Sequence, residues 1–129
     1  MATDPWMSFA VLAAGIQMIQ TDSGPVYLAH DQTGQSSPTL VVGPIEIFNF
    51  IEKRDGSARI HVALHLPKKS VKAGQATGNL KDGISLKLNY PDNLWGEVRL
   101  KREGNKAVES WSFWTPGSKY EGEIPVLTL

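Results

Sequence analysis

Three residues of types suited to acid–base chemistry lie in the segment IEIFNFIEKRDGSARIHVALHL (45–66). These are Glu46, His61 and His65. Histidine can act as a general acid or base, and a carboxylate that orients it completes an acid–base pair. If the two histidines share a strand, their Cα atoms lie about 13 Å apart, too far for two ligands of one metal ion. A polar pair of Glu46 and His65 on the wetter face of a sheet explains them more simply than catalysis.

The other patterns that carry enzyme chemistry are absent from the sequence. There is no phosphate-binding glycine motif, no HExxH and no GxSxG. The chain has no cysteine, which excludes disulfides, thiolate catalysis and cysteine-based zinc sites. The sequence therefore predicts a non-enzymatic protein without metal or cofactor. No spacing nominates an acid–base pair among the carboxylates Asp92, Glu97, Glu103, Glu109, Glu121 and Glu123.

Two tryptophans, Trp95 and Trp114, are out of phase with the apolar residues of their segment. Alternation places them on the opposite face, together with Asn89, Glu97 and Arg99. Indole rings beside a carboxylate, a guanidinium and an amide suit a sugar, which stacks on aromatic rings and forms hydrogen bonds through its hydroxyls. Burial as structural residues and a protein–protein interface are the alternatives.

The residues expected to bind a ligand or a partner lie on the faces predicted to be wetter, or in the turn beside them. They are Trp95, Trp114, Phe48, Phe50, Asn89, Asp92 and Asn93.

The sequence predicts that the segments carrying these residues are short β-strands. Gly and Pro recur at short intervals between runs rich in Val, Ile, Leu and aromatic residues, which is typical of antiparallel sheets. Residues 8–20 fit a strand slightly better than a helix, and residues 31–38 have the composition of a flexible loop. Residues 123–129 read as a final strand, with Pro125 favouring an edge. We expect one all-β domain over 1–129, an antiparallel sandwich or flattened barrel of about seven to nine strands.

The segment 45–66 predicts a hairpin. A two-residue turn at Asp55–Gly56 places Glu46 opposite His65 and Glu52 opposite Arg59. One face of this hairpin is then almost wholly aliphatic, and the other is mixed.

The segment 84–114 predicts three consecutive strands. Leu86 pairs with Val98 across the first turn, and Leu100 pairs with Trp111 across the second. This second register also brings Arg102 against Glu109. The predicted buried face consists of Leu86, Leu88, Val98, Leu100, Trp111 and Phe113.

Overall charge and the N-terminal segment restrict the partners. Thirteen basic residues balance thirteen acidic ones, so a nucleic acid is not an expected partner. The apolar stretch 9–16 is shorter than the ~20 residues of a membrane span, and no Lys or Arg precedes it. We therefore expect a cytoplasmic protein without a membrane span.

Three functions fit this sequence. The first is a non-enzymatic interaction or assembly module that self-associates or binds a protein through its aromatic surface, since zero net charge removes a barrier to association. The second is a lectin-like, carbohydrate-binding domain that uses Trp95 and Trp114. The third is a small ligand-binding barrel or enzyme in which Glu46, His61 and His65 line a cavity.

Overall fold

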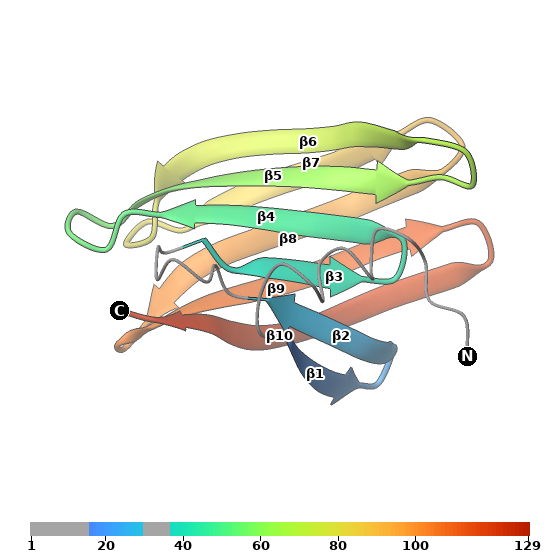
Figure 1. Cartoon of the computed structure of the whole chain (residues 1–129). Coiled ribbons are helices and arrows are strands. Elements are labelled where there is room, and N and C mark those ends of the chain that lie inside the picture. Colours follow the sequence, from blue (N-terminus) through green and yellow to red (C-terminus); the bar gives the residue numbers. More distant parts are fainter. Residues whose placement is uncertain (1–15, 30–36) are drawn as a thin grey trace.

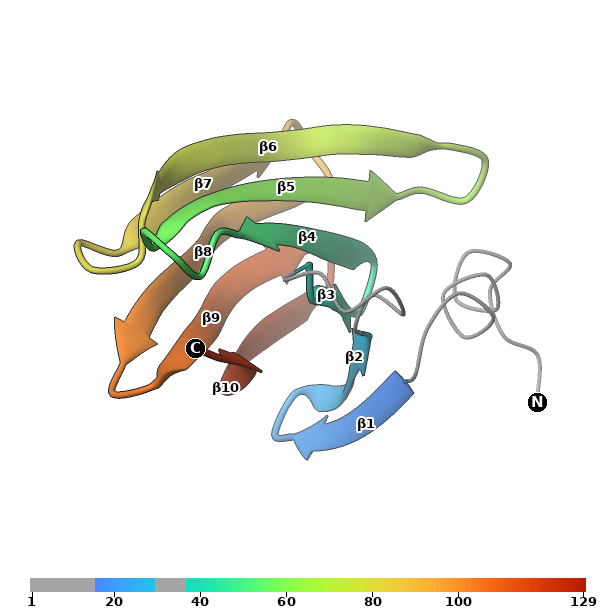
Figure 2. The same ribbon diagram turned by 60° about the vertical axis from the view of Figure 1, so that its left-hand side comes forward.

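The fold is known from a computed structural model, which describes residues 16–29 and 37–129. These residues form an all-β sandwich of two antiparallel sheets (Figures 1 and 2). The described part contains ten strands, more than the seven to nine predicted. The strands are β1 (Ile16–Thr21), β2 (Gly24–Ala29), β3 (Thr39–Val42), β4 (Ile45–Ile51), β5 (Ser57–His65), β6 (Ser70–Asn79), β7 (Ile84–Tyr90), β8 (Leu94–Glu103), β9 (Lys106–Thr115) and β10 (Ser118–Thr128).

Strands that follow one another in the chain lie side by side in each sheet. The six-stranded sheet has the order β1-β2-β3-β4-β5-β6, and the four-stranded sheet has the order β10-β9-β8-β7. The inner faces enclose one core, which includes the aliphatic face predicted for the 45–66 hairpin. The buried face predicted for 84–114 is confirmed, because Leu86, Leu88, Val98, Leu100, Trp111 and Phe113 are all buried.

The register predicted for the 45–66 hairpin is wrong by two residues. Glu46 lies opposite Ala63, and Phe50 lies opposite Arg59. The turn is wider than two residues, because Glu52 N–H donates to the Ser57 carbonyl across it. The Asp55 carboxylate holds this loop by accepting hydrogen bonds from the Ser57 amide (2.9 Å) and hydroxyl (2.7 Å). A shift of two keeps each residue on its predicted face.

The three strands β7, β8 and β9 contain one correct and one incorrect register. Leu86 lies opposite Val98, as predicted. Between β8 and β9 the turn is the two-residue Gly104–Asn105, so Val98 rather than Leu100 lies opposite Trp111. Arg102 consequently lies opposite Ala107, and the predicted ion pair with Glu109 does not form; Glu109 is fully buried instead.

The two ends of the described chain agree with the predictions that fall on them. The final strand is β10, which forms an edge of the four-stranded sheet and has a bulge beside Pro125. Residues 16–20 of the ambiguous segment 8–20 are part of strand β1, and residues 8–15 lie outside the described residues. Most of the predicted loop 31–38 also lies outside them. The described residues include no helix of the length and apolarity that a membrane crossing requires.

Candidate functional site

Three rows of outward-facing side chains cross all four strands of the four-stranded sheet, and we call these rows the tryptophan face. The rows are Asn89, Trp95, Trp114 and Lys119; then Lys87, Glu97, Ser112 and Glu121; then Ser85, Arg99, Ser110 and Glu123. Neighbouring rows are about 6.8 Å apart, because outward-facing residues alternate along a strand at about 3.4 Å per residue. One end of this face is therefore aromatic, and the remainder is polar.

The two tryptophans are direct cross-strand neighbours on this face. Trp95 and Trp114 are 46% and 37% exposed, among the most exposed large apolar side chains of the described residues. Lys119 Nζ lies 5.1 Å from the centre of the Trp114 ring, within the range of a cation–π contact. Exposed indole surface is costly in water, so this pair is a candidate contact surface.

A glycine next to Trp95 lets β8 and β9 approach closely at this point. Gly96 has a φ of 149°, a backbone conformation that side chains disfavour. A Cβ atom built there would lie 2.3 Å from the Ser112 carbonyl oxygen and 2.4 Å from the Phe113 Cα. This close approach fixes the strand that carries Trp95 against the strand that carries Trp114.

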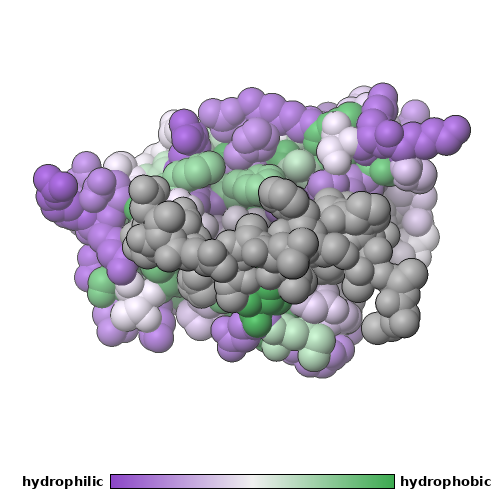
Figure 3. Space-filling model, in the orientation of Figure 1, coloured by the Kyte–Doolittle hydropathy of each residue, from purple (hydrophilic) through white to green (hydrophobic). Residues whose placement is uncertain are grey.

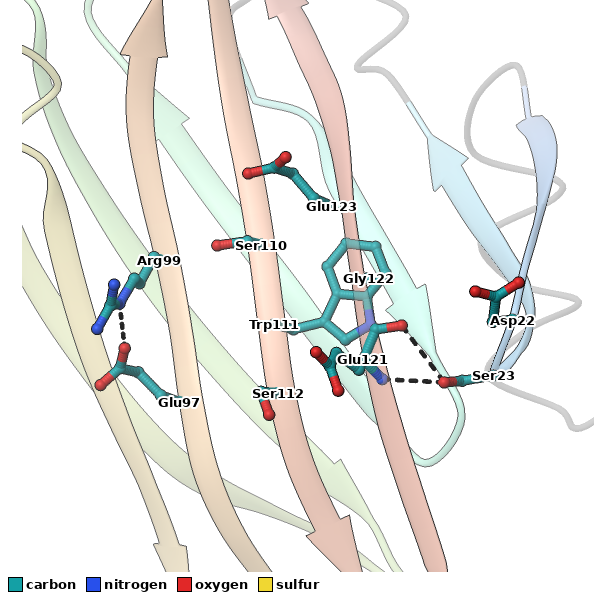
Figure 4. Close-up of a pocket in the computed structure, with 10 residues that line it drawn as sticks. All are labelled: Asp22, Ser23, Glu97, Arg99, Ser110, Trp111, Ser112, Glu121, Gly122 and Glu123. Carbon is teal, nitrogen blue, oxygen red and sulfur yellow. Dashed lines mark hydrogen bonds and ion pairs between the residues drawn. The ribbon is translucent and has the colours of Figure 1, made fainter.

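A polar groove of about 770 Å³ lies over the two polar rows of this face (Figure 4). The short side chains of Ser110 and Ser112 line it along β9, between longer side chains of β8 and β10. At the edge of β10 the turn between β1 and β2 adds Asp22 and Ser23. The groove therefore offers hydroxyl and carboxylate groups from four strands or turns.

Carboxylates outnumber cations in the groove. Asp22, Glu97, Glu121 and Glu123 line it, together with Arg99. Arg99 Nε forms an ion pair with Glu97 Oε1 on the same strand, which leaves part of that carboxylate available to a ligand. Such a lining accepts hydrogen bonds and disfavours anionic ligands.

The turn between β1 and β2 is attached to the edge of β10. The Ser23 hydroxyl accepts a hydrogen bond from the Glu121 amide (3.1 Å) and donates one to the Glu121 carbonyl (3.3 Å). This contact, visible in Figure 4, joins the two sheets at one wall of the groove.

The structure divides the predicted binding residues between two faces. Asn89, Trp95 and Trp114 share the tryptophan row. Asp92 and Asn93 lie in the turn at the end of β7, where the Asn93 side-chain Nδ2 donates to the Pro91 carbonyl.

The two predicted phenylalanines belong to the outer face of the other, six-stranded sheet. Phe50 is 41% exposed, with the Arg59 guanidinium 4.7 Å from its ring centre. Phe48 is half-buried and contacts His61 edge-to-face at 5.9 Å. Figure 3 shows hydrophobic residues over β4 and β5 on this side, bordered by hydrophilic ones. Phe48 and Phe50 therefore do not extend the tryptophan face.

The Glu46–His65 pair forms and includes a third residue. His65 Nε2 lies 3.0 Å from Glu46 Oε1, although Glu46 lies opposite Ala63 rather than His65. The Ser70 hydroxyl lies 2.7 Å from His65 Nδ1. His61 is not part of this group, since its ring packs against Phe48.

A second polar pair, which the sequence did not indicate, lies inside the sandwich. Glu109 of β9 and Asn49 of β4 are 0% and 1% exposed, and Asn49 Nδ2 donates to Glu109 Oε1 at 2.7 Å. Asn49 Nδ2 also donates to the Pro38 carbonyl at 3.1 Å. Burial raises the pKa of Glu109 to about 8, opposed in part by the hydrogen bond from Asn49. At neutral pH the two sheets are thus joined by an amide and a largely protonated carboxyl group.

Within residues 16–29 and 37–129, no group of three or more His, Asp or Glu side chains is arranged to hold a metal ion. Comparisons of the chain with protein-family models, with curated proteins and with solved structures found no match.

Proposed function

We propose that this protein is a small binding module that holds a short oligosaccharide on its tryptophan face. The observation that carries the proposal is the direct cross-strand pairing of Trp95 with Trp114, both exposed, at the end of a polar groove. The rings offer apolar surface to the C–H faces of a sugar. The serines and carboxylates beyond them offer hydrogen-bond partners to its hydroxyl groups.

Charge distribution favours a sugar over a protein partner. The centres of protein interfaces are depleted in charged residues. Here the row next to the tryptophans consists of Lys87, Glu97, Ser112 and Glu121, three of them charged. A neutral, hydroxyl-rich ligand can use these groups as acceptors and donors without burying them unpaired.

A screen of the purified chain against an array of oligosaccharides tests this proposal. We expect retention of a limited set of neutral or cationic glycans, with loss of at least tenfold in affinity in Trp95→Ala and in Trp114→Ala. Phe50→Ala is the matched control, because it removes an exposed aromatic ring from the opposite sheet. Binding that survives both tryptophan substitutions contradicts the proposal.

Self-association through the same two rings is the second candidate, since they form an exposed apolar pair on an outer sheet face. Light scattering coupled to size exclusion over a tenfold concentration range separates the two. A monomer that binds glycans supports the oligosaccharide. A dimer that dissociates in Trp95→Ala, together with an unresponsive array, supports assembly instead.

A further inference from the structure

Three polar side chains on the β4–β5–β6 side of the sandwich are connected in series. Glu46 Oε1 lies 3.0 Å from His65 Nε2, and His65 Nδ1 lies 2.7 Å from the Ser70 hydroxyl. The side chains of Glu46 and His65 are 14% and 11% exposed, whereas Ser70 is exposed. The hydroxyl is therefore accessible, and the two groups behind it are shielded.

The hairpin between β5 and β6 brings the serine to the histidine. Leu66 N–H donates to the Lys69 carbonyl across the turn, so Leu66 and Lys69 are a hydrogen-bonded pair. Because the two kinds of pair alternate along an antiparallel ladder, the next pair away from the turn, His65 and Ser70, is a non-hydrogen-bonded pair. Side chains of such pairs approach most closely in an antiparallel sheet. Glu46 reaches the same ring diagonally from β4.

The carboxylate determines which nitrogen of His65 bears the proton. A carboxylate only accepts hydrogen bonds, so Nε2 must be the donor to Glu46. In the neutral ring Nδ1 is then an acceptor, and the Ser70 hydroxyl donates to it. A nucleophile that donates to a base, with the base held by a third group, is the arrangement that activates serine hydroxyls.

Two further features surround the serine. Ser70 begins β6, an edge strand, and its non-hydrogen-bonded pairing with His65 directs its backbone N–H away from β5. Lys68 and Lys69 precede it in the turn, and both are exposed. The outward N–H can donate to an oxyanion formed next to Ser70, and the two lysines add positive charge to the adjoining turn.

We propose that Ser70 is a nucleophile that takes acyl groups from esters, with His65 as its base and Glu46 as the positioning residue. The Ser70 oxygen forms a bond to the ester carbonyl carbon, and its proton passes to His65 Nδ1. The C–O bond to the alcohol breaks, and the alcohol leaves with that proton. Water then attacks the acyl-serine in the same manner and releases the acid. This site lies on the sheet opposite the tryptophan face, so it is independent of the proposed binding function.

Two electrophiles test the proposal on the full chain. An alkyl fluorophosphonate transfers its phosphonyl group to an activated serine with loss of fluoride, and the product is stable. Peptide mapping by mass spectrometry is expected to locate the label on Ser70. A p-nitrophenyl acyl ester is expected to release p-nitrophenolate through the same residue.

Variants assign the roles. Ser70→Ala abolishes labelling, and His65→Gln reduces its rate by about 100-fold, the range of general-base catalysis. Glu46→Gln retains the fold and reduces the rate while altering its pH profile, which a merely structural role would not do. Ser118→Ala removes another exposed strand serine, one that is outside the tryptophan face, and leaves the rate unchanged. Label on Lys68, Lys69 or Lys72, an unlabelled Ser70, or ester cleavage at the wild-type rate in Ser70→Ala overturns the proposal.

Discussion

Substitution of the buried Glu109 by Gln should make the protein less sensitive to alkaline pH. The substitution keeps a carbonyl oxygen for the hydrogen bond that Asn49 Nδ2 donates to Glu109 Oε1. It also removes the group that must lose a proton inside the core. Glu109 is fully buried, and its other carboxyl oxygen has no hydrogen-bond partner.

The sign and size of the effect follow from the raised pKa. Burial raises the pKa of Glu109 from 4.5, its value in an unfolded chain, to about 8. Well below pH 4.5 the carboxyl is protonated in both the folded and the unfolded state, so its ionisation does not change the free energy of unfolding. As pH rises from 4.5 to 8 the unfolded chain loses the proton first, so the free energy of unfolding falls by about 1.4 kcal/mol per pH unit. At pH 7 the free energy of unfolding is therefore about 3 kcal/mol lower than in acid, and this loss levels off above pH 8.

Urea unfolding, followed by tryptophan fluorescence at pH 5, 6, 7 and 8, measures this penalty. The expected result is that wild type and Glu109→Gln are of similar stability near pH 5 and diverge with rising pH, with Glu109→Gln the more stable. Glu123→Gln, an exposed neighbour on β10, is the control and should follow the wild type. A difference between wild type and Glu109→Gln that does not change with pH would refute the reasoning.

Three further substitutions test separate contacts. Gly122→Ala should lower the free energy of unfolding by about 1–3 kcal/mol, because its Cβ would lie 2.5 Å from Cζ2 of Trp111; an unchanged urea midpoint would contradict this. His65→Ala should lower the free energy of unfolding by about 1 kcal/mol or less, since loss of the imidazole opens Glu46 to water and Ser70 is already exposed; a loss of several kcal/mol would show that the group is structural. Ser23→Ala should lower the hydrogen-exchange protection of the Glu121 amide, with β8 and β9 unaffected.

The sequence predicted which face each residue occupies better than it predicted which residues meet. Alternation assigned Trp95 and Trp114 to the face opposite Val98 and Trp111, and the structure agrees. Both incorrect registers are shifted by two residues, which leaves alternation intact. Turn geometry decides between such registers, and in the 45–66 hairpin it depends on hydrogen bonds from Ser57 to Asp55.

The same shift concealed the centre of the candidate site. The predicted pairing of Leu100 with Trp111 would place Trp114 opposite Glu97, whereas the two-residue turn places it opposite Trp95. The pairing of Trp95 with Trp114 can therefore be predicted only when the turn between β8 and β9 is known to contain two residues.

Contacts between the two sheets could not be predicted from the sequence, for a different reason. Glu109 and Asn49 belong to different sheets, and nothing in alternation states which inward residues of two sheets meet. The contact between Ser70 and His65 was easier to predict, because the turn between β5 and β6 places the two residues opposite each other. A turn formed by Leu66, Pro67, Lys68 and Lys69 could have been proposed from the sequence.

The most direct test of the account is a two-dimensional NMR titration of the wild-type chain with the oligosaccharides that the array retains. We expect shifts of the Trp95 and Trp114 indole N–H signals and of amides in β8, β9 and β10, with the Phe50 amide unmoved. Shifts confined to the six-stranded sheet, or no retained oligosaccharide at all, would contradict the assignment of the tryptophan face as a sugar-binding surface.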